Sequence, residues 1–245
     1  MTSLIFAKRN IKEQLRSPIN LFFTLAFPIL MFFVFQLIKL GTGATDKIVP
    51  MFATNNLIPS IAIFSYTFVS LTQCTQIAKD RETAFQARLT VSPMQPKHFF
   101  WGYFLPSLAI VVVQTTLCFV VGLCFGLKFT LGTLFAFLSL IPISLFYICV
   151  GIILGSVLGS KSCAGVATIF VQLTSIFSGM FFPLTEGTFR DVLTCFPFLP
   201  SVAIPQCLIA QTYQDIVLYV LILSAYTIVA FVFAHLLFSK QLKNK

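Results

Sequence analysis

The residues with the clearest potential for chemistry form a glycine- and lysine-containing run at 155–162. The run reads Gly-Ser-Val-Leu-Gly-Ser-Lys-Ser, which partly follows the pattern of a phosphate-binding loop. That pattern needs four residues between its glycines and a glycine directly before the lysine. Here three residues separate Gly155 from Gly159, and Ser160 precedes Lys161. We therefore argue against nucleotide binding and interpret Gly151, Gly155 and Gly159 as small residues that allow two helices to pack closely.

Other residues that carry chemistry are sparse. No His-Glu-x-x-His motif occurs and no two cysteines form a C-x-x-C pair, so we predict neither a catalytic residue nor a metal site. Most of the seven cysteines lie in apolar runs, where cysteine behaves as a small hydrophobic residue. Cys195 and Cys207 share one predicted outer segment, and a disulfide between them is left open.

The composition is that of a membrane protein. Of the 245 residues, 58% are apolar and only 9% are charged, whereas a soluble domain has roughly 25% charged residues. Lipid must therefore solvate much of the chain, and we predict a single all-α polytopic domain over 1–245. The net charge of +9 is explained better by basic cytoplasmic segments than by nucleic-acid binding.

Six apolar runs are long enough to cross about 30 Å of hydrocarbon. The predicted spans are 19–38, 54–76, 99–125, 131–158, 164–184 and 216–238. The first run is too long for the apolar part of a signal peptide, and we expect a kink at Pro28.

Residues 3–17 form a predicted amphipathic helix before the first span. Leu4, Ala7, Ile11 and Leu15 fall on one face at helical spacing. The adjacent side carries the basic residues Lys8, Arg9, Lys12 and Arg16. Such a helix lies in the bilayer interface with its cations on anionic headgroups.

Basic residues also predict the orientation. With both termini in the cytoplasm, 12 Lys and Arg residues lie in inner segments and 4 lie in outer ones. This asymmetry favours a cell-membrane protein with cytoplasmic termini, which requires an even number of spans.

The outer segment 185–215 is apolar but contains Pro197, Pro200 and Pro205. Three prolines so close together prevent one continuous spanning helix. We therefore expect short helices that dip into the outer leaflet before the last span.

The predicted span cores contain no Asp, Glu, Lys or Arg. Gradient-driven carriers usually need an ionisable group at membrane depth, and narrow channels need a filter or charged rings. If the chain moves a substrate, a partner must supply the energy.

The inner connection 77–98 is the segment that such a partner would contact. Residues 80–92 are predicted to form a short helix with an acidic start, in which Phe85 and Leu89 share one face. Pro93 and Pro96 end it. A solvated helix on the headgroups and a docking helix for a cytoplasmic protein both fit this pattern.

The connection also resembles a stretch of the ABC type-two exporter permease family. That stretch typically reads Arg-Glu-Lys-Gly-Thr-Leu-Glu-Arg-Leu-Leu-Val-Thr-Pro after the second span. The matching residues are Arg81, Glu82, Arg88, Leu89, Val91 and Pro93. A second similar stretch, residues 177–184, reads Phe-Ser-Gly-Met-Phe-Phe-Pro-Leu. Ala84 and Ala87 depart from the family pattern, which often has Gly and an acidic residue there.

The resemblance implies a non-enzymatic permease in a homodimer or a paralogous heterodimer. A separate ATP-binding cassette ATPase would bind ATP and Mg, and this chain would hold no cofactor. The coupling residues implied on this chain are Asp80, Arg81, Glu82, Phe85, Arg88, Leu89 and Pro93.

The implied cargo is a hydrophobic or amphipathic compound that leaves the cell, such as a drug or peptide antibiotic. A lipid-linked glycan is the alternative within the family. An energy-independent channel or scaffold and a membrane enzyme with an unrecognised site also stay open. Candidate path residues, which could instead face lipid or other helices, are Phe64, Tyr66, Phe68, Gln73, Phe170, Gln172, Thr174, Phe177, Phe181 and Phe182.

Overall fold

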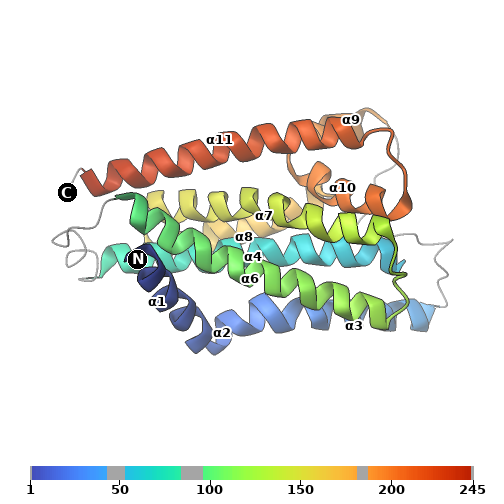
Figure 1. Ribbon diagram of the computed structural model, residues 1–245, viewed down its shortest axis with the longest axis horizontal. Helices are drawn as coiled ribbons and strands as arrows, with labels where there is room; N and C mark the ends of the chain where they lie inside the picture. The colour runs from blue at the N-terminus through green and yellow to red at the C-terminus, as the bar shows by residue number, and fades with distance from the viewer. Residues whose placement is uncertain (1, 43–52, 84–95, 181–186, 244–245) are drawn as a thin grey trace.

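The computed structural model describes residues 2–42, 53–83, 96–180 and 187–243, and its regular structure in these ranges is entirely helical (Figure 1). Five helices are long and apolar enough to span a membrane, or six if a bent pair counts as one span. The predicted all-α polytopic fold is confirmed. The helices are α1 (Thr2–Arg16), α2 (Pro18–Leu21), η1 (Phe22–Ala26), α3 (Phe27–Thr42), α4 (Thr54–Glu82), α6 (Pro96–Cys124), α7 (Leu131–Val157), α8 (Ser160–Phe177), α9 (Thr188–Thr194), α10 (Phe198–Ala210) and α11 (Ile216–Lys243).

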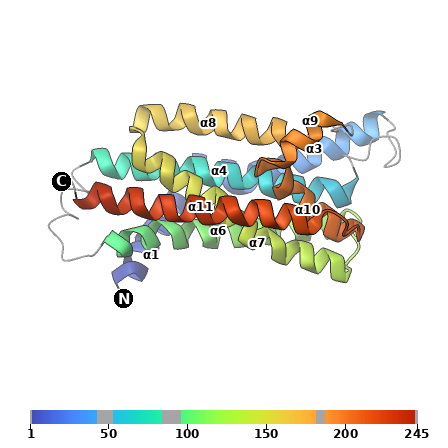
Figure 2. The ribbon, with the colours of Figure 1, turned by 90° about the horizontal axis from the view of Figure 1, so that it is seen from above.

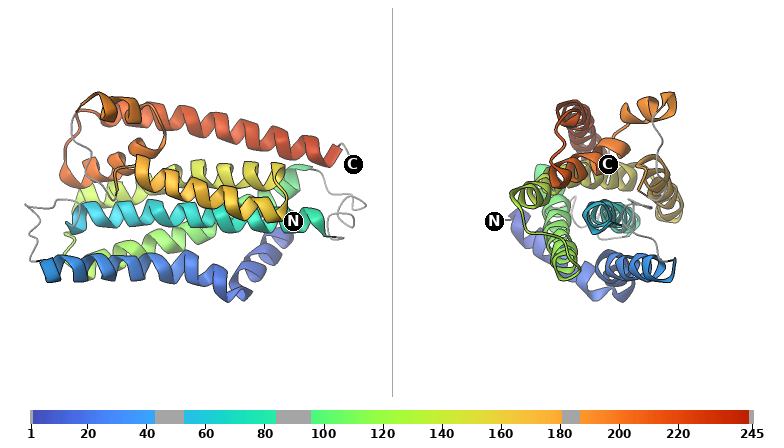
Figure 3. Two further views of the ribbon diagram at one scale, coloured as in Figure 1. Left: turned by 180° about the vertical axis from the view of Figure 1, so that it is seen from behind. Right: turned by 90° about the vertical axis from the view of Figure 1, so that its right-hand side faces the viewer.

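Helix α4 is the centre of the bundle. It lies among α3, α6, α7 and α8 when the bundle is viewed along its length (Figure 3, right). Most of α4 is buried, whereas much of α3 and α11 is exposed. The exposed residues of α3 and α11 are largely apolar, which suits contact with lipid.

Both chain termini lie at one end of the bundle, which we call the terminus end (Figure 1). Helices α9 and α10 and the short connection between α6 and α7 lie at the opposite end. Helix α8 runs beside α4 toward this opposite end (Figure 2). The shared location of the termini is what an even number of crossings produces.

Helix α1 is amphipathic, as predicted, but it packs on a different face. Phe6, Ala7, Asn10 and Gln14 are buried, whereas Leu4 is 66% and Leu15 is 50% exposed. The Phe6 ring lies against Gly102 of α6 so closely that no Cβ would fit there. Contacts with other helices therefore determine which face of α1 is buried. That face includes the polar residues Asn10 and Gln14, which a purely apolar stripe would not include.

The first span is irregular before Pro28, not at it. Residues Phe22–Ala26 form a π-helical turn, in which the N–H of Phe27 donates to the carbonyl of Phe22. Pro28 has no N–H to donate to the carbonyl of Thr24, four residues earlier. The side-chain amide of Gln114 on α6 donates to that carbonyl instead. A kink was expected at Pro28, whereas the irregular backbone of this span is the wider π-helical turn at Phe22–Ala26.

Helix α4 continues past its predicted end at residue 76 to Glu82. Asp80, Arg81 and Glu82 are thus the last turn of a spanning helix, and the prediction that Asp80 begins a separate helix is wrong. The rest of the predicted inner helix, including Phe85, Arg88, Leu89 and Pro93, lies outside the described residues.

The predicted fifth span also has different bounds. Helix α8 begins at Ser160, four residues before the predicted start at 164, and ends at Phe177. Helix α8 is not one of the five helices that are long and apolar enough to span a membrane. Helices α9 and α10 meet at 94° and occupy the segment predicted to hold short outer helices.

Two glycines bring α7 into backbone contact with α4. A Cβ atom on Gly151 would lie 2.9 Å from the carbonyl oxygen of Ser70, and one on Gly155 would lie 2.8 Å from that of Cys74. Gly159 does not continue this stripe because it is the N-cap of α8.

One disulfide joins Cys74 of α4 to Cys163 of α8. Sequence analysis interpreted most cysteines as small hydrophobic residues because they lie in apolar runs, and it did not predict this pair, whose members are 89 positions apart. Cys195 and Cys207, whose pairing the sequence left open, are free thiols.

We expect Gly155→Ala to destabilise the bundle, because backbone atoms of α4 occupy the space that the new methyl group needs. Overpacking of this kind costs about 1–3 kcal/mol. Gly165→Ala on α8 is the matched control, because nothing lies within 4 Å of its Cβ position. Unfolding in mixed micelles with increasing denaturing detergent measures both variants. Equal midpoints for the two would contradict the close approach of α4 and α7.

Candidate functional site

The last turn of α4 carries three charged residues in succession: Asp80, Arg81 and Glu82. Successive residues of an α-helix point about 100° apart, so these three side chains leave α4 in three directions. Each meets a different neighbour. We call these residues the charged turn.

Asp80 joins α4 to α1 and α6. Its carboxylate accepts a hydrogen bond of 2.6 Å from the hydroxyl of Tyr103, and both terminal nitrogens of Arg9 lie 3.3 Å from its oxygens. Asp80 is only 7% exposed. Arg9 also pairs with Glu13 at 2.9 Å. Because a buried carboxylate needs hydrogen-bonded partners, these contacts fix α1 against the end of α4.

Two further hydrogen bonds hold α1 in place. The side-chain amide of Asn10 donates to the carbonyl of Gly102 on α6 at 2.9 Å. The amide of Gln14 donates to Gln76 of α4 at 2.8 Å. Both residues of α1 are buried. Helix α1 is thus docked on the bundle by specific polar contacts as well as by its amphipathic character.

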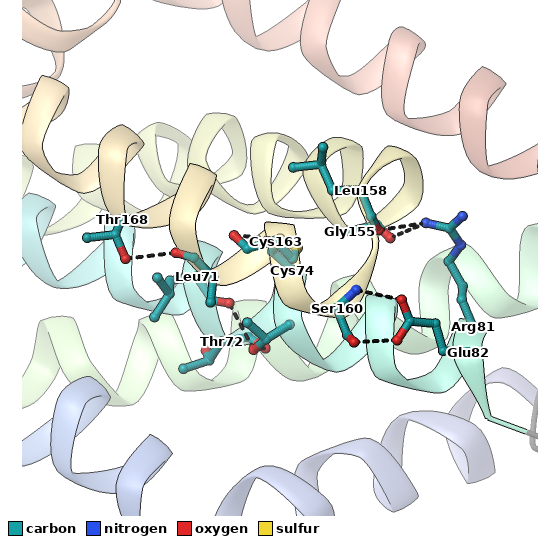
Figure 4. Close-up of a disulfide and its surroundings, with 12 residues drawn as sticks. Leu71, Thr72, Cys74, Arg81, Glu82, Gly155, Leu158, Ser160, Cys163 and Thr168 are labelled. Carbon is teal, nitrogen blue, oxygen red and sulfur yellow. Dashed lines mark hydrogen bonds between the residues drawn. A yellow bond between two sulfur atoms is a disulfide. The ribbon is translucent and has the colours of Figure 1, made fainter.

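Arg81 points toward the end of α7 (Figure 4). One guanidinium nitrogen donates to the carbonyl of Gly155 at 2.9 Å and to that of Leu158 at 3.1 Å. Carbonyls in the last turn of a helix lack partners within the helix and carry partial negative charge. The cation of Arg81 therefore caps the C-terminus of α7.

Glu82 points toward the start of α8 (Figure 4). Its carboxylate accepts a hydrogen bond of 2.7 Å from the backbone N–H of Ser160 and a second one from the hydroxyl of that residue. Gly159, the N-cap of α8, has no side chain that could do this. An anion at a helix N-terminus is favourable, so Glu82 supplies the missing cap from another helix.

The charged turn therefore connects the end of α4 to α1, α6, α7 and α8 at once. Sequence analysis selected its three residues but assigned their side chains to an external partner. Here those side chains bond within the chain. Their backbone leads directly into residues 84–95, which lie outside the described part. Lys8, Lys12 and Arg16 of α1 are exposed, whereas Arg9 is partly buried.

A groove of about 530 Å³ lies between α3, α4 and α8, together with the π-helical turn. Aromatic side chains form one wall. On α8, Thr168, Gln172 and Ser175 line the groove at i, i+4 and i+7, which is one helical face. The groove thus has an aromatic wall and a polar wall. Its residues are Phe23, Phe27, Met31, Phe64, Phe68, Leu71, Thr168, Val171, Gln172 and Ser175.

Only some of the candidate path residues line the groove, and others are buried and bonded elsewhere. Phe64, Phe68 and Gln172 line the groove. Tyr66 and Gln73 are buried and bond to α6, through Thr115 and the carbonyl of Tyr103. Thr174 is buried and bonds to Phe170 within α8.

The remaining aromatic candidates lie elsewhere. Phe170 packs near Tyr147 and Phe198, and Phe177 packs near Phe196 and Phe198. Phe181 and Phe182 lie outside the described residues. Sequence analysis missed Phe23, Phe27 and Met31, because the first span was not expected to contribute to a path. Their spacing of four was the available signal.

Comparison with known families identifies the chain. The model of the ABC-2 family transporter proteins matches residues 42–236. The chain belongs to this family. The resemblance noted in the sequence is confirmed, and the ABC-2 chain is a multi-pass permease subunit of an ABC transporter. Membership in this family generally implies that the permease works with an ATPase partner. A comparison with curated proteins finds no match.

We expect Asp80→Asn to loosen the docking of α1, because it removes the charge that Arg9 and Tyr103 bind. Hydrogen bonds to charged groups contribute about 1.5–3 kcal/mol. Lys79→Gln removes one charge from the same turn at an exposed position and should change stability by less than about 0.5 kcal/mol. Thermal unfolding in detergent micelles measures both. A larger loss for Lys79→Gln would refute the assignment.

Proposed function

We propose that this ABC-2 permease exports a hydrophobic or amphipathic compound, such as a drug or peptide antibiotic, with energy from ATP hydrolysed by a separate ATPase. The observation that carries the proposal is the charged turn. It joins four helices to the start of the segment that resembles the family's docking stretch. A force applied to that segment would reach all four helices.

The contacts of the charged turn support this route. Segment 84–95 begins one residue after Thr83, the C-cap of α4. Displacing it pulls on Arg81 and Glu82, which hold the two ends of the turn between α7 and α8. Through Asp80 the same displacement reaches α1. The ATPase is therefore proposed to bind at residues 84–95, with both termini in the cytoplasm.

The groove supports an amphipathic cargo. Phe23 and Phe68 stack with ring centroids 5.6 Å apart, and Phe27 meets Phe68 edge to face at 5.3 Å. Opposite these rings, the exposed amide of Gln172 supplies both a donor and an acceptor. Aromatic faces bind apolar bodies, and a single amide binds a polar group without requiring a full charge.

A dimer would enclose this groove. Ile169, Leu173 and Ile176 of α8 are exposed beside it, which leaves an apolar strip that a second copy can cover. A homodimer or a paralogous heterodimer would then present two grooves to one central path. We propose that the compound moves along this path from the cytoplasmic side to the outside of the cell.

We expect exchange of the two charges, Arg81→Glu with Glu82→Arg, to abolish partner-driven transport. An anion would then face the terminal carbonyls of α7 and a cation would face the N-terminus of α8, so both caps become repulsive. ATP-dependent dye uptake into inside-out vesicles containing the ATPase should fall to about a tenth or less.

Arg190→Asp with Asp191→Arg is the matched exchange, made at neighbouring residues of α9 at the opposite end. It should leave uptake close to the wild-type rate. Membrane insertion of both variants is checked by quantitative blotting of washed membranes. Normal uptake by a correctly inserted variant with Arg81→Glu and Glu82→Arg would contradict the proposed transmission of force through the charged turn.

We expect Phe68→Ala to weaken the interaction with amphipathic substrates, because it removes the ring that both Phe23 and Phe27 contact. Loss of such aromatic contacts corresponds to about a fivefold to tenfold rise in KM for transported dyes. Phe135→Ala, at an α7 residue that is 54% exposed and outside the groove, is the control. Unchanged KM values across a panel of amphipathic dyes would remove the groove from the path.

A further inference from the structure

A second cavity lies at the bend where α1 meets the first span, apart from the groove. Its volume is about 160 Å³. Its walls come from α1, α2, the π-helical turn, α4 and α6. We call it the elbow pocket. It shares no lining residue with the groove.

The walls of the elbow pocket are mainly apolar. Ile11, Leu21, Leu25, Ile110 and Val113 are among its lining residues. Val113 is 51% and Leu15 is 50% exposed, so the rim opens on the outer surface of the bundle between α6 and α1. An apolar pocket with an exposed apolar rim suits a hydrocarbon chain that enters from the bilayer.

One polar group in the pocket lacks a partner. Gln14 is 6% exposed and lines the pocket, and its side-chain carbonyl oxygen makes no hydrogen bond. Its amide nitrogen is already used by Gln76. A buried acceptor without a donor is unfavourable, so the pocket is incompletely satisfied when nothing occupies it.

The backbone at the pocket is itself unusual. Thr24 and Leu25 line it from the π-helical turn Phe22–Ala26. Isolated π-helical turns are rare and frequently occur at functional sites. The wider turn, together with the bend after Arg16, keeps α1 and the first span apart where the pocket lies.

Charge on α1 favours one kind of occupant. Lys12 follows the lining residue Ile11, and Arg16 follows the lining residue Leu15. Both cations are exposed and lie on the helical face next to that lining edge. A cation pair beside an apolar pocket, on a helix that precedes a span, complements an anionic headgroup attached to an acyl chain.

We infer that the elbow pocket binds an anionic phospholipid of the leaflet that contacts α1. One acyl chain occupies the pocket, and the phosphate lies against Lys12 and Arg16 at its rim. Phosphatidylglycerol has both features. The lipid holds α1 at its angle to the first span, independently of which compound the permease transports.

The test uses the full-length chain in phosphatidylcholine vesicles that contain a small fraction of a lipid with a photoreactive diazirine in its acyl chain. The probe is either phosphatidylglycerol or phosphatidylcholine. After illumination, peptide mass spectrometry locates the adducts. We expect adducts at residues 11–25 and 109–113, about thirtyfold more from the phosphatidylglycerol probe, the size expected for two cations near an anionic headgroup.

Two variants separate pocket filling from charge. Ala109→Phe places a ring at the exposed edge of the pocket and should remove these adducts. Ala225→Phe at an exposed site of α11 is its control and should not. Lys12→Ala with Arg16→Ala should abolish the preference for phosphatidylglycerol, whereas Lys240→Ala at the exposed end of α11 should keep it.

Equal labelling by the two probes would overturn the inference, as would adducts that survive Ala109→Phe. Equal labelling that a transported dye displaces would show a substrate pocket in place of a lipid site. Because the assay needs neither ATP nor the ATPase, its failure leaves the proposed export function standing, and a failure of transport leaves the lipid site standing.

Discussion

The charged turn at the end of α4 is the constraint on which the arrangement of the other helices depends. Three charges in one turn leave the helix in three directions, and each is bound by a complementary group: Asp80 by Arg9 and Tyr103, Arg81 by the carbonyls that end α7, and Glu82 by the N–H group that begins α8. Charges so close to a membrane are unfavourable unless they are paired or cap a helix. Their pairing explains how a mainly apolar helix can end in three charged residues, of which Asp80 is buried, Arg81 is partly buried and Glu82 is exposed.

The groove and the charged turn share helix α4 but differ in character. The groove is built from aromatic rings and a few neutral polar groups, which adapt to many apolar shapes. The charged turn is built from directional ionic hydrogen bonds, which fix one geometry. The proposed export would use both properties, because the groove would have to accept varied compounds whereas the charged turn would have to transmit the movement of an ATPase. Helix α4 carries both, with Phe64 and Phe68 on the groove and Asp80–Glu82 at its end.

Sequence reasoning predicted the helical class and the family because lipid-solvated spans and the Arg81–Pro93 stretch are local signals. It could not predict contacts that depend on distant residues. Nothing near Glu82 indicates that Ser160 is its partner, and nothing near Cys74 indicates Cys163. The length of α4 was underestimated because charged residues lower the local hydropathy, although tertiary partners keep them helical. The face of α1 was misassigned for the same reason, since Asn10 and Gln14 are buried by bonds to other helices.

The glycine contacts and the disulfide act on the same half of α4. Gly151 and Gly155 let α7 touch its backbone, and Cys74 bonds it covalently to α8. Sliding of these three helices past one another is therefore blocked over that half, as close-packed interfaces deform little. Their other half has no covalent link among the described residues. If the groove widens during the proposed transport, the far ends of these helices would have to move apart about a fixed point near the terminus end.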